Sequence, residues 1–362
     1  QELPGVEFSY AMNQQTHLNF SGFGGQGVLF LVDGERLAGE TMDDVDFTRL
    51  SMDNVQRIEI VKGAASALYG SNATGGVINI ITKRSLDPWT LNVNARLSKH
   101  NEQRYGASFG LNGSHWNNML TANWNRRDNY DVHSAANPVT RVISTVYGDK
   151  TLNLKDQLTW NPVSGFSLTG KAGYFFRETV RSAAQPERYR DFTGGLRMNW
   201  TISADDALTA SYNFDQYDKS DYQRITRKDI RDYSNVQNTF RMLYNHSFED
   251  GDVLTVGADY LHDYLYNTNL EGSTRKQDSF DVFYQYDWRM SDKWEAVGAV
   301  RYDYFSDGKE SHLTPKINLC YKPTADLAIR AGYGMGFRAP SLKEKYYNFD
   351  MSGIWIVEGN PD

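Results

Sequence analysis

From residue 89 onward, apolar and polar side chains alternate with a period of two, and this pattern constrains the fold more than any other feature of the chain. Side chains of a strand point alternately to its two faces, so such a segment is apolar on one face and polar on the other. Residues 89–336 contain about thirteen strands of this kind, each near the roughly 9–11 residues that a tilted membrane strand needs. In the clearest strand the apolar set is Leu208, Ala210, Tyr212 and Phe214, and the polar set is Thr209, Ser211, Asn213 and Asp215.

The connectors between these strands also alternate, in length. A transmembrane barrel has short periplasmic turns and longer extracellular loops, whereas a soluble sandwich or propeller, the alternative fold, has no reason to alternate them. If the chain before residue 89 lies on the periplasmic side, the first strand runs outward and the segment after Gly336 is an outer loop. The short connectors are 113–117, 161–165, 203–206, 249–252, 290–293 and 322–326, and long polar ones are 129–147 and 219–235.

Composition narrows the class of protein further. A net charge of −7 argues against general nucleic-acid binding. A mean hydropathy of −0.61, with no apolar run near the ~20 residues of a spanning helix, argues against membrane helices. The 23 Tyr, 18 Phe and 8 Trp suit a membrane–water boundary. The single cysteine, Cys320, excludes an intrachain disulfide within this stretch and is predicted to be a packing residue.

The stretch 55–84 separates the alternating strands from a shorter, mixed region before them. Two β-branched runs, 57–61 and 77–82, flank a middle rich in small residues, where glycines permit positive φ angles and close backbone approach. The glycines of this turn are Gly63, Gly70, Gly75 and Gly76.

This stretch resembles the end of the plug domain of TonB-dependent outer-membrane receptors, which closes with a similar RIE-hydrophobic-KG, LYG and GG-hydrophobic-INI pattern. With LPGV and VDGERL upstream, the resemblance covers residues 3–84. It implies an all-β, antiparallel transmembrane barrel with an N-terminal mixed α/β plug domain inside the lumen. We expect a plug at 1–86, lacking its N-terminal part, and the first half of the barrel at 87–362, because about thirteen strands cannot close a barrel of roughly 22.

The resemblance also implies a function and a location. The protein is expected in the outer membrane of a Gram-negative bacterium, where it imports a scarce ligand with energy from TonB and its inner-membrane complex. The TonB box would lie upstream of Gln1, and so would any secretion signal that has not been removed. No nucleophile elbow, HExxH, Walker loop or dinucleotide fingerprint is present, so we expect no enzyme. A passive porin or a surface adhesin is the alternative class.

Three charged residues, Arg57, Glu59 and Lys62, fall in a strand that the barrel would enclose. Buried charges need partners, and residues two apart share a face of a strand. In the resembling family this region helps to hold the plug until TonB pulls on it. We therefore predict a latch between plug and wall, and the alternative is a pair of solvated charges.

A second stretch that resembles this receptor family is 332–362. Phe337, Arg338, Ala339 and Pro340 match the FRAP box of haem receptors of the HmuR type in this family, and residues 360–362 begin the NPDL box. Those receptors usually carry a haem-ligating histidine between the boxes, which this chain lacks. Cobalamin receptors have related sequences here. Arg338 and the haem-ligand substitutes Tyr346, Tyr347 and Met351 are the candidate ligand-binding residues, and plain aromatic loop packing is the alternative for the last three.

None of the seven histidines forms a close metal-ligand pair in sequence, so no metal site is predicted. His17 lies in the plug beside a segment that suits an apical loop, and plug histidines contact haem in the resembling family, so His17 is also a candidate. The favoured ligand is haem, as a transported ligand and not a prosthetic group. Cobalamin is second and a siderophore third. Outer-membrane lipids and a surface haem-binding lipoprotein are further candidate partners.

Overall fold

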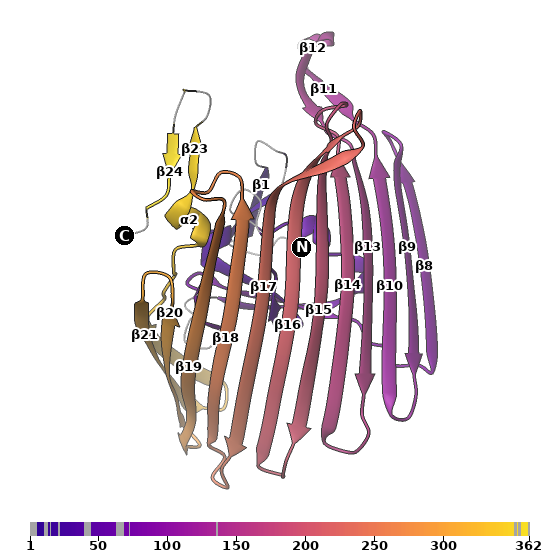
Figure 1. Ribbon diagram of the computed structural model, residues 1–362. Helices are drawn as coiled ribbons and strands as arrows, with labels where there is room; N and C mark the ends of the chain where they lie inside the picture. The colour runs from indigo at the N-terminus through magenta and orange to yellow at the C-terminus, as the bar shows by residue number, and fades with distance from the viewer. Residues whose placement is uncertain are drawn as a thin grey trace.

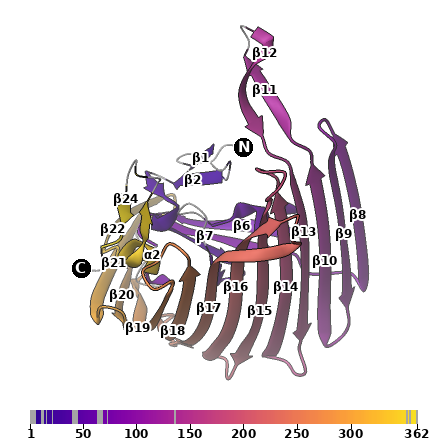
Figure 2. The same cartoon turned by 45° about the horizontal axis from the view of Figure 1, so that its top comes forward.

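The computed structural model describes residues 6–10, 14, 16–20, 22–39, 45–62, 69–71, 73–134, 137–350, 353 and 356–360. A long antiparallel sheet curves around a smaller domain, which lies on its concave side (Figures 1 and 2). We call the curved sheet the wall and the smaller domain, up to the end of β7, the plug. This arrangement confirms the predicted fold class.

The wall is a sheet of thirteen strands in the order β22-β21-β20-β19-β18-β17-β16-β15-β14-β13-β10-β9-β8. Every neighbouring pair is antiparallel and nearly every connection is a hairpin, as in an up-and-down barrel. The strands are β8 (Trp89–Ser98), β9 (Glu102–Asn112), β10 (Trp116–Arg127), β13 (Asp149–Trp160), β14 (Phe166–Thr179), β15 (Glu187–Thr201), β16 (Asp206–Gln223), β17 (Lys228–Ser247), β18 (Val253–Asn267), β19 (Thr274–Ser291), β20 (Trp294–Phe305), β21 (Glu310–Thr324) and β22 (Leu327–Gly334).

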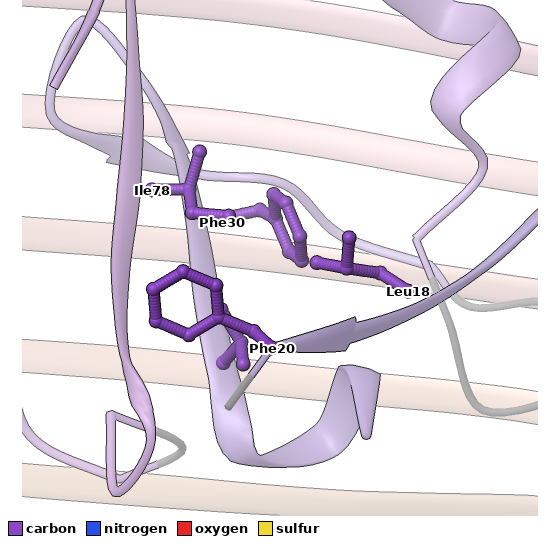
Figure 3. Close-up of a cluster of buried hydrophobic side chains, with 5 residues drawn as sticks. Leu18, Phe20, Phe30 and Ile78 are labelled. Carbon is purple, nitrogen blue, oxygen red and sulfur yellow. The ribbon is translucent and has the colours of Figure 1, made fainter. Parts of the chain in front are cut away.

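The plug contains two small sheets, β1-β2-β3 and β5-β4-β7-β6, in which β4 and β7 are parallel. Leu18, Phe20, Phe30 and Ile78 pack between them as an apolar core (Figure 3). The elements are β1 (Val6–Tyr10), β2 (Thr16–Phe20), β3 (Phe23–Gly24), β4 (Val28–Val32), β5 (Glu35–Arg36), β6 (Val55–Lys62), β7 (Gly76–Thr82) and the 3-10 turns η1 (Gly25–Gly27), η2 (Phe47–Arg49) and η3 (Met52–Asn54).

The burial of the wall is inverted relative to a soluble sandwich. Apolar side chains on its convex face are exposed, with Leu196 at 56% and Phe240 at 47%, while polar ones on the concave face are buried, with Thr169 at 5% and Asp215 at 2%. A sandwich buries its apolar face against a second sheet, so the soluble alternative is wrong. The outward apolar face is the one that contacts lipid in a membrane barrel. No helix in the described part of the chain is long and apolar enough to cross a membrane.

The six predicted short turns are present at one rim, and the segment 129–147 forms a separate hairpin at the other, β11 (Tyr130–Ser134) and β12 (Asn137–Val146) (Figure 1). The prediction of a long connector at 219–235 was wrong. Strands β16 and β17 continue through most of it as a paired extension and leave only 224–227 as a turn. These residues lack an apolar face, but backbone pairing and cross-strand ion pairs such as Lys219–Asp232, at 2.9 Å, do not need one.

Beyond β22 the chain forms an outer segment at the rim that carries the β11–β12 hairpin, as predicted (Figure 1). It contains α2 (Leu342–Tyr346), β23 (Asn348–Asp350) and β24 (Ile356–Glu358). Among the plug-turn glycines, a positive φ is confirmed at Gly70, +78°, and Gly76, +146°. Gly75 is instead needed for close packing, because a Cβ there would lie 2.6 Å from Cγ of Phe23. Gly63 lies outside the described residues.

Candidate functional site

Asp46 joins the plug to two wall strands. It caps η2 by accepting a hydrogen bond from the Thr48 amide at 3.1 Å. Its carboxylate also accepts from the Arg177 guanidinium of β14 at 3.1 Å and from the Tyr217 hydroxyl of β16 at 2.7 Å. Burial opposes ionisation of this carboxyl, but Arg177, Thr48 and Tyr217 outweigh it and hold the pKa of Asp46 below its usual value. Asp46 is therefore a charged plug residue neutralised by the wall.

Arg49, at the end of the same turn, makes the complementary contact. Its guanidinium lies 2.9 Å from Asp191 of β15 and 2.9 Å from Asp215 of β16, and it also donates to the Ala38 carbonyl. Asn153 of β13 donates to the Arg49 carbonyl at 2.5 Å. Burial would lower the pKa of Arg49, but the two carboxylates outweigh burial and raise it. The side chain is 2% exposed, so its charge depends wholly on these partners.

Backbone amides beside these charges also bind the wall. The amide of Ala38 donates to Asp215 at 2.8 Å, and the amide of Gly39 donates to the Asn235 side chain at 2.7 Å. Gly39 has φ of +74°, and a Cβ there would lie 2.5 Å from Cβ of Tyr217. Only glycine allows this approach of plug and wall without displacing the tyrosine.

A third set of contacts lies along β5 and the turn before it. Asp33 is 3.1 Å from Lys171 of β14, and Glu35 pairs with Arg197 of β15. Burial opposes ionisation of Asp33, but Lys171 and hydrogen bonds from Thr82 together lower its pKa. Three wall strands, β14, β15 and β16, thus hold the plug through oppositely charged pairs of both polarities. We call the pairs of Asp33, Glu35, Asp46 and Arg49 with the wall the plug–wall ion pairs.

Arg301 of β20 anchors a second charged region, on a different part of the wall. It is 1% exposed and pairs with Asp281 at 2.7 Å, Asp303 at 2.8 Å and Asp259 at 3.1 Å. Gly70 of the plug faces this guanidinium, and a Cβ there would lie 2.7 Å from its Nη2. The plug therefore contacts the wall here through a glycine that leaves room for a buried cation.

The plug turn at 69–71 also connects to the outer segment. Arg36 of β5 donates to the carbonyls of Tyr69 at 2.5 Å and Ser71 at 3.1 Å. The Ser71 hydroxyl in turn accepts a hydrogen bond from the amide of Ala339 at 2.9 Å. A displacement of β5 would thus reach the outer segment through two hydrogen-bonded steps.

Local contacts of the outer segment explain where the candidate Arg338 points. Ser341 caps α2 and forms a capping box with Glu344. Arg338 binds the same Glu344 with Nη1–carboxylate distances of 2.8 and 2.9 Å. Burial opposes ionisation of Glu344, but Arg338 and the Ser341 amide lower its pKa. Arg338 therefore stiffens the start of α2 and lines a cleft between plug and wall.

The tyrosine candidates lie where α2 docks on two outer loops. The Tyr346 hydroxyl donates to Asp307 at 2.7 Å, and the Arg275 guanidinium lies 4.4 Å from the centre of its ring. The hydrogen bond to Asp307 raises the pKa of Tyr346, which disfavours the phenolate that would bind iron. Tyr347 forms a bridge with Leu270 and packs near Phe349. Both rings thus have packing roles in this structure.

The other predicted residues are spread over the plug. Arg57 and Glu59 pair with each other at 2.7 Å, with 57% and 44% of their side chains exposed, so their latch role stays a prediction. Lys62 pairs with Gly76 in the β6–β7 register, and its side chain lies outside the described residues. His17 is half-buried in β2, opposite Ser9. Met351 lies outside the described residues. In the described ranges no group of three His, Cys, Asp or Glu side chains suits a metal ion.

The plug–wall ion pairs were missed by sequence reasoning. Asp191 and Asp215 fall at inward positions of alternating strands, and such positions are where carboxylates need a partner. The need of these carboxylates for a partner could therefore have been predicted from the sequence. The identity of the partner could not, because Arg49 lies in a short turn without any periodic pattern.

A curved antiparallel wall with a polar lumen, closed by a domain held there through ion pairs, defines a plugged membrane barrel. Two family models match the chain: the TonB dependent receptor-like beta-barrel over residues 105–362 and the TonB-dependent receptor plug domain over residues 1–77. The chain belongs to this family, whose members are outer-membrane proteins of Gram-negative bacteria.

Individual relatives agree with this assignment. The chain is similar to the vitamin B12 transporter BtuB of Photobacterium profundum, at 26% identity over 99% of this chain and 58% of the relative. It is also similar to the iron-regulated outer membrane virulence protein of Vibrio cholerae, at 24% identity over 99% of this chain and 57% of the relative. The fold matches a crystal structure of the ferric enterobactin receptor PfeA of Pseudomonas aeruginosa, with a TM-score of 0.80, 17% identity and coverage of 94% and 60%. The chain thus spans just over half the length of these proteins.

Proposed function

We propose that the protein is an active transporter that imports a scarce, bulky ligand across the outer membrane with energy delivered through TonB. The plug–wall ion pairs carry this proposal. Ion pairs join the plug to β14, β15 and β16, and all of them must separate together before the lumen opens. A pathway closed in this way needs an external pull, whereas a passive porin needs an open lumen.

For the ligand we propose cobalamin first. The relatives named as vitamin B12 transporters support this choice, because they match along nearly the whole chain. Haem, the choice favoured by the sequence boxes, is second, since the described tyrosine candidates are engaged in other contacts. Tyr346 is bound to Asp307, and Tyr347 packs in the α2 docking site. A siderophore is third.

One titration separates the two main ligands. Cyanocobalamin and haemin are added in turn to the purified full-length receptor, and binding is followed by tryptophan fluorescence and by the haem absorbance band. We expect saturable cobalamin binding and only weak, non-saturable haemin binding. Saturable haemin binding whose absorbance band is lost in Tyr346→Phe or His17→Ala, with no cobalamin binding, would instead establish haem.

The energy requirement is tested by uptake in cells. Labelled ligand is supplied with and without an uncoupler that collapses the proton gradient. We expect uptake to stop while surface binding continues. Uptake that persists after uncoupling would contradict the proposal and favour a passive porin.

A further inference from the structure

The outward face of the wall changes character at the outer ends of β15, β16 and β17. On β15, Leu196 and Phe192 are exposed on the convex face, at 56% and 43%. Arg190 and Arg188 follow at the next two alternate positions, so they lie on the same face. The intervening Asp191 points inward, where it binds Arg49. A lipid-facing apolar row is thus followed directly by two guanidinium groups, which end the apolar band on this strand.

These two arginines are held in fixed positions. Arg190 binds Asp229 at 2.8 Å, and Arg188 binds Glu178 at 2.8 Å and stacks 3.4 Å above the ring of Tyr222. Their side chains are still 27% and 20% exposed. Held in this way, a guanidinium loses little further freedom when it binds an anion, and its planar fork matches the oxygens of a phosphate group.

The tip of the β16–β17 extension adds more positive charge. Residues 224–231 contain Arg224, Arg227, Lys228 and Arg231 against the single acid Asp229, a net charge of +3 in a chain of net −7. The side chains of Arg224, Arg227 and Lys228 are exposed and make no hydrogen bond or ion pair with another described residue.

An apolar residue sits among these cations. Ile225 is 93% exposed, in the middle of the basic tip. An isoleucine flanked by cations suits the boundary between head groups and acyl chains.

We propose that Arg188, Arg190 and the basic tip at 224–231 form a binding surface for the phosphate groups of a glycolipid in the outer leaflet. The face of the sheet selects a lipid over a soluble anion. The arginines of β15 continue the lipid-contacting row, on the side of the wall opposite the lumen and the cleft. A transported anion would have to be bound on the concave side.

The test uses the full-length receptor in a neutral detergent. A diphosphorylated glycolipid of the lipid A type is titrated and its binding is counted by native mass spectrometry, in parallel with the same lipid after removal of its phosphates. We expect the phosphorylated form to bind at least about a hundredfold more tightly, because roughly fivefold in affinity is expected for each cation that meets an anionic lipid surface. Equal binding of the two forms would overturn the proposal.

Variants locate the site. Arg224→Gln, Arg227→Gln and Lys228→Gln together break no ion pair, so the fold is preserved, and they should weaken binding of the phosphorylated glycolipid by roughly a hundredfold. Arg190→Lys keeps the charge but loses the planar fork, and a smaller loss is expected. The matched control is Lys293→Gln, in a turn at the opposite rim, which should bind like the unmodified receptor.

Two further outcomes decide against the site. Unchanged lipid binding in the triple variant would place the lipid elsewhere. Inorganic phosphate that competes at equal concentration with the glycolipid would show a site for a soluble anion. Neither result depends on transport, so the proposed function is tested separately by the binding and uptake experiments described for it.

Discussion

Removing the guanidinium of Arg49 is the most direct perturbation of the plug. In Arg49→Ala, Asp191 and Asp215 would stay inside the lumen with their side chains 7% and 2% exposed and no cation between them. Breaking a buried pair from one side costs about 3–5 kcal/mol, because the remaining charge loses its paired cation and gains little water in return. At 1.4 kcal/mol per factor of ten, the equilibrium for plug opening should rise roughly a hundredfold to a few thousandfold.

Hydrogen–deuterium exchange of the full-length receptor measures this opening. Amides of the plug strands β4 and β7, which contain Phe30 and Ile78, should exchange faster by the same factor, while amides of the wall hairpins stay protected. The barrel itself should keep its thermal midpoint, because the lost contact joins plug to wall and not one wall strand to another.

Two controls test the reasoning. Arg57→Ala also removes an arginine from an ion pair of the plug, but that pair is half exposed and should contribute only about 0–1 kcal/mol. The triple change Arg49→Met, Asp191→Asn and Asp215→Asn removes all three charges and should recover most of the protection. The reasoning is refuted if Arg49→Ala exchanges like the unmodified protein, or if Arg57→Ala exchanges as fast as Arg49→Ala.

Three further outcomes follow from the same geometry. Gly39→Ala should destabilise the plug by about 2–5 kcal/mol in urea titrations, because backbone strain at a φ of +74° adds to the overlap of its Cβ with Tyr217. Gly22→Ala, which has a positive φ of +88° but open space, should show backbone strain alone, about 1–2 kcal/mol. Because the pKa of Asp46 is lower in the folded protein, its contribution to plug stability should be complete above the usual carboxyl pKa and should fade as the pH drops through the folded value. Asp46→Asn should abolish this pH dependence. A plug that loosens instead as the pH rises would contradict the expectation. Leu196→Arg, on the lipid-facing side, should lower barrel stability by about 2–4 kcal/mol in refolding titrations if it lies near the bilayer centre, and no loss there would contradict the membrane orientation.

The fold was largely predictable because its main signal is local. Alternation at positions such as Leu208 and Ser211 fixes which side of a strand is apolar, and six short turns mark where strands reverse. The extension of β16 and β17 was missed because its side chains are polar on both faces. Above the membrane, backbone pairing is enough to form a strand, and hydropathy patterns do not report it.

The candidate site was less predictable because its partners are distant in sequence. Arg49 and Asp215 are 166 positions apart, and nothing in either local sequence identifies the other. Arg57 and Glu59 attracted attention as neighbouring charges, yet neighbouring charges of opposite sign can satisfy each other, as they do here at 2.7 Å. Arg338 likewise binds Glu344, six residues away.

The separation of Arg49 from its carboxylates has a consequence for assembly. The plug is synthesised first, but Asp191 and Asp215 lie 142 and 166 residues further along the chain. The plug can therefore close only after β15 and β16 have been delivered and paired. Until then Arg49 stays hydrated, and the plug remains loosely attached. Closure of the pore is thus timed by the pairing of β15 and β16, so a receptor in which these strands had not yet paired would carry an unfastened plug, which periplasmic proteases could recognise and remove.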